Sequence, residues 1–262
     1  MTNKHGDFIW YELLTPDQDA ARAFYEKVVG WTIDKAADNE MDYRMINSAS
    51  GPIAGSMTLS DAMQSAGASP CWLGYINVSD VDTVVEATTA AGGTVHLEPQ
   101  DVDGVGRIAM VADPSGAAFY VMKPVPPAGD PDASSNSFAA TEPMVGHCAW
   151  NELRSSDPAK ALNFYHDLFG WEKDGEMDMG PMGKYEFLRH DHMIGAIMPK
   201  PDDNPVSAWL FYFRVPDIDA AAAAISREGG KILQPPIEIP GGDHATIAMD
   251  PQGARFALVG TR

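Results

Sequence analysis

The sequence predicts an α+β fold built from four copies of one module, in which a strand leads into a helix and then into two or three further strands. The first reason is a long repeat: WYELLTPDQDAARAFYEKVVGW, Trp10–Trp31, returns without a gap as WNELRSSDPAKALNFYHDLFGW, Trp150–Trp171. The second is another repeated block, Trp72–Met122, which returns as Trp209–Val259. Repetition on this scale indicates that one folding unit was duplicated.

Each block opens with a strand-like run, such as FIWYELL at 8–14, and continues into an amphipathic helix. Asp17 and Asp157 stand where a helix N-cap is expected, while Gly30 and Gly170 suit a left-handed residue at the helix end. At the three- and four-residue spacing of a helix, the residues that share one face are Ala21, Phe24, Tyr25 and Val28, with the copies Ala161, Phe164, Tyr165 and Leu168.

Short apolar runs separated by Gly, Pro and Asp turns follow each helix and predict the remaining strands. In the first half these runs are YRMI and IAGSM in the first block, and RIAMVAD and AFYVM in the second. Each block is therefore typical of a β-α-β-β-β unit, and the chain contains four such units.

A segment rich in proline, serine and small residues, KPVPPAGDPDASSNSFAATEPMVG, separates the two repeats. It has no apolar periodicity, which is typical of a linker. The sequence therefore predicts a first domain of two modules at 1–124, a linker at 125–145 and a second domain of two modules at 146–262. Whether modules pair within or across the two halves stays open.

The 262-residue chain is strongly acidic, with 18 basic against 37 acidic residues and a net charge of −19. This charge repels nucleic acid and anionic membranes, so neither is expected as a partner. No run approaches the roughly 18 apolar residues of a membrane-spanning helix. Two cysteines, Cys71 and Cys148, are too few for a disulfide framework and favour a reducing cytoplasm. A homo-oligomer is left open.

The phrases FYEKVVGW and FYHDLFGW, followed by VSDVDTVVEATTAAGG and the ending DPSGAAFYVM, resemble the glyoxalase, bleomycin-resistance and extradiol-dioxygenase superfamily, also called vicinal oxygen chelate proteins. The resemblance covers nearly the whole chain outside the linker. The paired WxEL openings and DPxGAxF turns are most similar to a four-module branch of glyoxalase-like mycobacterial antigens. The resemblance implies that pairs of modules curl into cup-shaped sheets, giving two cups that each enclose a small molecule.

The resemblance also implies where a metal ion would bind, since metal-dependent members place histidine or glutamate ligands on the first and last strands of each module. The aligned residues here are Trp10, Leu73 and Tyr120 in the first half, and Trp150, Leu210 and Ala257 in the second. None is a strong ligand for a divalent metal, whereas glyoxalase and extradiol chemistry both require one. We therefore expect no metal and no other cofactor.

Glu12 and Glu152 are the candidate catalytic residues. The two-residue alternation of a strand places each on the same face as the tryptophan two positions earlier. A carboxylate beside an indole can act as a general base or anchor a cationic or hydroxylated ligand. The alternative is that each merely caps loop amides at the strand end.

Aromatic side chains on the cup-lining strands are the candidate ligand-binding residues, because they offer stacking area and, in tyrosine, a hydroxyl group. Arg255 is expected to face the second cup where Ala118 faces the first, unless it is an exposed strand residue. The predicted ligand-binding set is Trp10, Trp150, Tyr75, Tyr212, Tyr120 and Arg255. The remaining tryptophans, Trp31, Trp72, Trp171 and Trp209, are expected in the core.

The predicted function is metal-independent binding of a small, partly apolar or aromatic molecule, akin to resistance-type sequestration. One alternative is a glyoxalase-like lyase, isomerase or hydroxylase that acts on a small carbonyl compound with a non-standard metal site. Another is a structural or signalling protein whose cups are filled by its own side chains. The sequence does not identify the ligand.

Overall fold

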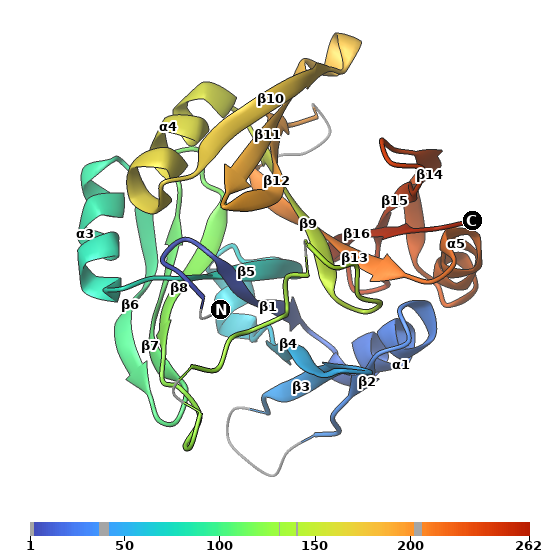
Figure 1. Ribbon diagram of the computed structural model, residues 1–262. Helices are drawn as coiled ribbons and strands as arrows, with labels where there is room; N and C mark the ends of the chain where they lie inside the picture. Colours follow the sequence, from blue (N-terminus) through green and yellow to red (C-terminus); the bar gives the residue numbers. More distant parts are fainter. Residues whose placement is uncertain (1–2, 37–41, 131, 140, 202–205) are drawn as a thin grey trace. The chain divides into compact units, whose positions relative to one another are not determined.

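The computed structural model describes residues 3–36, 42–130, 132–139, 141–201 and 206–262. Within them it confirms the four modules (Figure 1). The first half contains β1 (Phe8–Thr15), α1 (Gln18–Val28), β2 (Thr32–Ile33), β3 (Arg44–Ser48), β4 (Gly51–Thr58), the short α2 (Asp61–Ser65), β5 (Cys71–Asn77), α3 (Val81–Ala90), β6 (Thr94–Val102), β7 (Gly106–Ala112) and β8 (Ala118–Pro124). The second half contains β9 (Cys148–Ser155), α4 (Pro158–Phe169), β10 (Glu172–Asp178), the 3-10 turn Gly180–Met182, β11 (Lys184–His190), β12 (His192–Pro199), β13 (Ala208–Val215), α5 (Ile218–Arg227), β14 (Lys231–Glu238), β15 (His244–Met249) and β16 (Arg255–Gly260).

Each half of the chain forms one mixed sheet of eight strands. The strand orders are β2-β3-β4-β1-β5-β8-β7-β6 and β10-β11-β12-β9-β13-β16-β15-β14, so the second sheet repeats the first. In every module the first strand pairs in parallel with the last, as β1 with β4, β5 with β8, β9 with β12 and β13 with β16. Parallel neighbours require a crossover connection, which the module's helix and its antiparallel strands provide.

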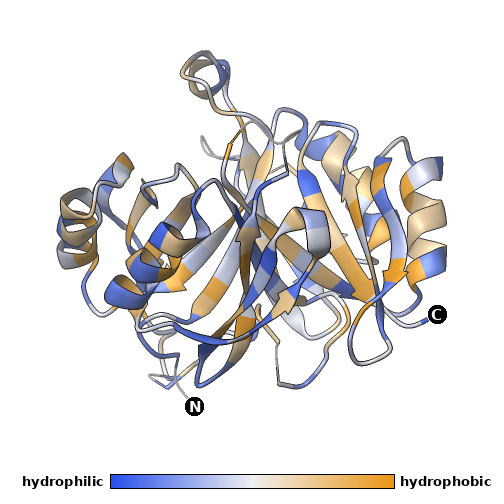
Figure 2. Ribbon diagram, turned by 90° about the horizontal axis from the view of Figure 1, so that it is seen from above, coloured by the Kyte–Doolittle hydropathy of each residue, from blue (hydrophilic) through white to orange (hydrophobic). Residues whose placement is uncertain are grey.

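The predicted helix ends are confirmed. The Asp17 side chain accepts a hydrogen bond from the backbone N–H of Ala20, and Asp157 does the same for Lys160. Gly170 ends α4 in the left-handed region at φ 70°, while in α1 the cap residue is Val29 and Gly30 follows it at φ 82°. Apolar colour concentrates in the strands and hydrophilic colour in the loops (Figure 2). No helix in the described residues is both long and apolar enough to cross a membrane.

The chain folds into two compact units, and each unit takes segments from both halves of the sequence. Unit 1 consists of Met1–Ile9, Gly74–Ser135 and Asn151–Trp209, which is most of the second and third modules. Unit 2 consists of Trp10–Leu73, Asn136–Trp150 and Leu210–Arg262, which is most of the first and fourth modules. The division of the chain into domains at 1–124 and 146–262 stays a prediction.

The core of unit 2 is an aromatic cluster around Tyr25 of α1. The Tyr25 ring lies 5.3 Å from that of Phe256 and 5.5 Å from that of Trp72. Trp72 Nε1 donates to Tyr25 Oη at 2.9 Å, and this hydroxyl donates to Asp250 Oδ2 at 3.0 Å. The Asp250 carboxylate belongs to the DPQG turn of the fourth module, so a buried hydrogen-bond chain joins the first module to the last.

Unit 1 repeats this arrangement with the equivalent residues. Trp209 Nε1 donates to Tyr165 Oη, which donates to Asp113 Oδ2, each at 3.2 Å. Trp171 stacks on Tyr165 at 5.1 Å and donates from Nε1 to the backbone oxygen of Gly6 at 2.9 Å. The four tryptophans expected in the core are all buried, which confirms that prediction.

The linker prediction leads to a proteolysis experiment. Residues 125–130 are exposed, so we expect a protease to cut there first. We further expect the two fragments to elute together in gel filtration, because Tyr25 and Asp250, like Tyr165 and Asp113, hold opposite halves in one core. Nicked protein that is denatured before elution is the control. Two separate, folded fragments would contradict this expectation and support domains at 1–124 and 146–262.

Candidate functional site

Trp10 and Glu12 lie on the same face of β1 in unit 2, Trp10 half-buried and Glu12 buried. Trp10 Nε1 donates to Tyr43 Oη at 2.8 Å. Gly55, which lies opposite Glu12 in the β1–β4 register, makes room for this tyrosine, since a Cβ at Gly55 would stand 1.9 Å from Tyr43 Oη. The structure thus adds Tyr43, which the sequence analysis did not single out although it opens the YRMI run.

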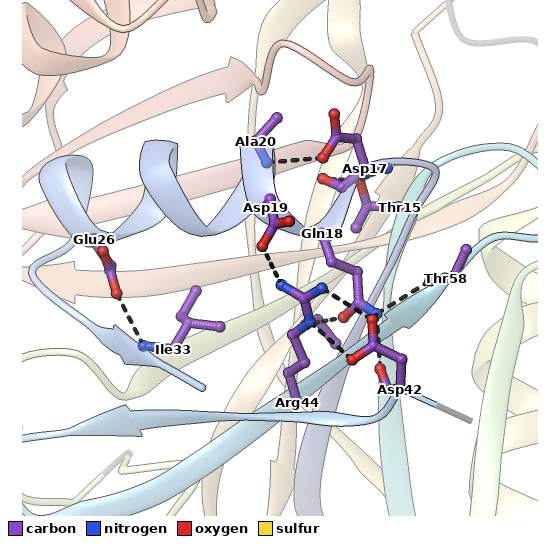
Figure 3. A network of polar contacts seen from close by, with 11 residues as sticks. Thr15, Asp17, Gln18, Asp19, Ala20, Glu26, Ile33, Asp42, Arg44 and Thr58 are labelled. Atoms are coloured by element: carbon purple, nitrogen blue, oxygen red, sulfur yellow. Dashed lines mark hydrogen bonds and ion pairs between the residues drawn. The ribbon is translucent and has the colours of Figure 1, made fainter. Parts of the chain in front are cut away.

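A polar network around the buried side chains of Arg44 and Gln18 fixes the chain beside this tyrosine (Figure 3). The Arg44 guanidinium donates to both carboxylate oxygens of Asp42, at 3.1 and 2.9 Å, and to Asp19 at 2.6 Å. The Gln18 side-chain amide donates to the Asp42 backbone oxygen at 2.7 Å and to Thr58 Oγ1 at 3.1 Å. These bonds tie the start of β3 to α1 and β4. They therefore fix the backbone on both sides of Tyr43, which precedes β3.

Glu152 of β9 lies in unit 1, where its carboxylate contacts an arginine and a tyrosine. Its Oε1 accepts from Arg154 Nε at 2.7 Å, and its Oε2 accepts from Tyr185 Oη at 2.9 Å. Tyr185 opens the run YEFL as Tyr43 opens YRMI, but the residue that aligns with Arg154 is Leu14. Both oxygens of Glu152 therefore already accept a hydrogen bond, one of them from a charged donor.

The thiol of Cys71 lies close to Glu12. Burial, and secondly the charge of Glu12, raise the pKa of Cys71 to about 12, and burial raises the pKa of Cys148 to about 12 as well. Both cysteines are free thiols.

The raised pKa values predict that both cysteines are unreactive, because the thiolate is the nucleophile and hardly forms at mildly alkaline pH in either residue. We expect iodoacetamide to leave folded protein unmodified and to label both residues in denaturant, as measured by intact mass. Labelling of folded protein at the rate of a free peptide thiol would contradict the raised pKa values of the two thiols.

Tyr75 and Tyr120 come together in unit 1. They are opposite each other in the β5–β8 register, and their rings stack at 4.2 Å with an angle of 6° between the planes. Both side chains are buried. One face of each ring is thus occupied by the other, and a ligand in contact with this pair would meet the remaining faces or edges.

Trp150, Tyr212 and Arg255 come together in unit 2. Tyr212 and Ala257 are members of an apolar group that we call the β13–β16 cluster, and the half-buried Trp150 packs against it. Arg255 lies on β16 two residues before Ala257, hence on the same strand face, and it is half-buried. The β13–β16 cluster comprises Leu210, Tyr212, Ala245, Ile247, Ala257 and Val259, with Ala149, Trp150 and Ile239 packed against it.

The side chains at the positions that the family resemblance assigns to metal ligands do not fit a divalent metal. Leu73, Leu210 and Ala257 carry no donor atom, and the indole nitrogens of Trp10 and Trp150 are hydrogen-bond donors without a lone pair for a metal. The sixth residue, Tyr120, is stacked on Tyr75. Within the described ranges there is also no group of three or more His, Cys, Asp or Glu residues able to hold a metal ion.

The chain is similar to known proteins over most of its length. A family model described as Glyoxalase/Bleomycin resistance protein/Dioxygenase superfamily matches residues 8–121 and 144–258. The chain is 31% identical over 256 residues to the Mycobacterium tuberculosis (strain CDC 1551 / Oshkosh) protein named "Putative glyoxylase CFP32", covering 95% of this chain and 93% of that protein. It is 28% identical over 275 residues to "Anthracycline biosynthesis protein DauV" of Streptomyces sp. (strain C5), covering 97% and 92%.

A solved structure shows the same fold. The Mn(II)-bound glyoxalase from Novosphingobium aromaticivorans matches with a TM-score of 0.65 and 17% sequence identity, over 99% of this chain and 83% of that one. At this identity the likeness concerns the fold alone.

Proposed function

Because the chain belongs to the glyoxalase, bleomycin resistance protein and dioxygenase superfamily, we propose that it binds a small, partly apolar or aromatic molecule and does so without a metal ion. One observation carries the proposal: tryptophan, leucine, tyrosine and alanine occupy the positions that the resemblance assigns to metal ligands. These side chains replace a charged coordination site with apolar and aromatic surface, which favours ligand binding by stacking and burial.

The β13–β16 cluster, with the partly buried Trp150 packed against it, is the described apolar group best suited to such a ligand. Trp150 is half-buried at its edge, so part of the indole remains accessible, and Tyr212 contributes a second ring. Small-molecule sites are mostly apolar with a few polar groups that orient the ligand. The name of the relative DauV refers to anthracycline biosynthesis, and anthracyclines are planar polycyclic molecules, which supports a planar aromatic ligand here.

A second candidate function is a glyoxalase-like lyase, isomerase or hydroxylase that acts on a small carbonyl compound. The observation that favours it is Glu12, a buried carboxylate two residues from Trp10, in a chain whose relative is named a glyoxylase. In this case Glu12 would act as the general base. We place the protein in the cytoplasm, since both of its cysteines are free thiols.

Chelation and titration test the proposal. We expect treatment with a chelator to change neither the melting temperature nor the affinity for planar aromatic probes, because a bound metal would stabilise the native state by mass action and its loss would be visible. Chelator-treated protein with Mn²⁺ or Zn²⁺ added back is the control. A melting temperature or affinity that falls with chelator and returns with metal would contradict metal independence. Turnover of a small carbonyl compound that is lost in Glu12→Gln but kept in Glu152→Gln would establish the second candidate.

A further inference from the structure

We propose that the β13–β16 cluster and Arg255 together bind a carboxylate attached to an aromatic ring system, with the guanidinium taking the carboxylate and the cluster taking the rings. This inference rests on the proposed function and narrows its ligand from a small apolar molecule to an aromatic acid.

The position of Arg255 places a positive charge beside the β13–β16 cluster. Ala257 and Val259, both cluster members, follow it at two-residue spacing on β16 and share its strand face. Ala257 lies beside Tyr212 in the parallel β13–β16 register. Because the two strands run in the same direction, Arg255 stands at the amino end of the cluster, as does Leu210. One end of this apolar cluster therefore carries a cation.

Arg255 also lacks the kind of partner that other strand arginines have. It makes no hydrogen bond or ion pair within the described part of the chain, although the protein carries a net charge of −19. The planar guanidinium of arginine matches the two oxygens of a carboxylate, so a ligand carboxylate would supply, in bidentate form, the hydrogen bonds that no group of the described residues makes to Arg255. The other strand arginines each pair with a carboxylate: Arg44 with Asp19 and Asp42, Arg107 with Asp82, Arg154 with Glu152, Arg189 with Asp174 and Arg214 with Asp243.

The duplication shows that packing alone does not require an arginine at this position. The turn before β16 reads DPQGARF, and the equivalent turn before β8 reads DPSGAAF, so that Ala118 stands where Arg255 does. The same fold thus forms with a methyl group at this point. A long cationic side chain at this position is therefore a feature of the second half only, which points to a ligand rather than to the fold.

The side chains near Arg255 also favour a carboxylate over a phosphate as the bound anion. One guanidinium matches the single charge and the two oxygens of a carboxylate, and apolar side chains make up the rest of the cluster. The rings of Trp150 and Tyr212 favour a planar body behind that carboxylate. A phosphate monoester would bring about two negative charges into a largely apolar setting with one cation to balance them.

A matched pair of probes tests the inference: 2-naphthoate, and the uncharged 2-naphthamide of nearly the same shape. Titration calorimetry on the full chain should show 2-naphthoate binding about tenfold or more tightly than the amide, because a charge-assisted bidentate contact is stronger than a neutral one. In Arg255→Met this preference should disappear while the affinity for the amide is kept. Arg22→Met, which removes the other arginine without a described partner, on α1, is the control and should retain the preference.

The possible results distinguish the carboxylate site at Arg255 from the binding of aromatic molecules in general. Equal affinity of the wild-type protein for both probes would overturn the carboxylate site and leave binding of aromatic molecules standing. A preference that survives in Arg255→Met would overturn the assignment to this residue. Binding of neither probe would overturn the inference and count against the proposed function as well. If Arg255→Met does not fold, salt dependence of the wild-type protein decides, since salt should weaken only the binding of the acid.

Discussion

Replacement of Trp171 by alanine is expected to lower the free energy of unfolding by about 3 to 5 kcal/mol, the usual cost of truncating a buried aromatic residue. Trp171 is 1% exposed, stacks on Tyr165 and bonds to the backbone of Gly6, so its loss leaves a cavity and an acceptor without its donor. Trp150→Ala should cost much less, because that indole is only half-buried at the edge of the β13–β16 cluster. Denaturant titration of both variants measures the difference.

Binding should show the reverse order. Trp150→Ala is expected to weaken the binding of a planar aromatic probe about threefold to tenfold through lost stacking. Trp171→Ala, measured below its melting temperature, should bind nearly as the wild-type protein does. If Trp171 controlled affinity and Trp150 controlled stability, the face of β9 that we assign to the ligand would be the wrong one.

The second large effect is expected from Asp250→Ala, which should lower the free energy of unfolding by about 3 kcal/mol or more. Asp250 Oδ1 accepts from the backbone N–H groups of Gln252, Gly253 and Ala254 at 2.8–3.0 Å, and Oδ2 accepts from Tyr25. Alanine would leave these donors without their acceptor in a partly buried turn, and each such group that is buried costs about 1 to 3 kcal/mol.

Asp217→Ala is the matched control for this variant. It is the same substitution in the same unit, but Asp217 caps α5 through one bond to the backbone N–H of Ala220 at 2.8 Å. The loss of an N-cap typically costs about 1 kcal/mol. Equal destabilisation by the two variants in a denaturant titration would show that the Asp250 carboxylate is not a link between the first and fourth modules.

The elements of this fold could be predicted from the sequence because their signals are local. The N-cap at Asp17 depends on a neighbouring backbone N–H, and the left-handed exit at Gly170 depends on its own missing Cβ. The duplicated pattern supplied a second copy of each signal. The same repeat indicated correctly that Trp171 and three further tryptophans are buried.

The candidate site was only partly predictable. Strand alternation placed Glu12 with Trp10, but no sequence rule indicated that Tyr43 would meet the indole, since this contact needs the space left by Gly55. Nor did the repeat show that Glu152 binds Arg154 and Tyr185. Arg154, which binds Glu152, aligns with Leu14 of the other half, so the repeat places no arginine at the corresponding position beside Glu12.

The sequence by itself thus determined the module, its four copies and the superfamily, because capping, periodicity and repetition act between residues close together in the chain. Only the tertiary structure decided which modules share a core. Tyr25 bonds to Asp250, and Tyr165 to Asp113, across long stretches of chain. Four similar modules present similar apolar faces, so hydrophobic patterning alone does not distinguish one pairing from another. The pairing follows from directional hydrogen bonds and ring packing, which depend on three-dimensional position and not on distance along the sequence.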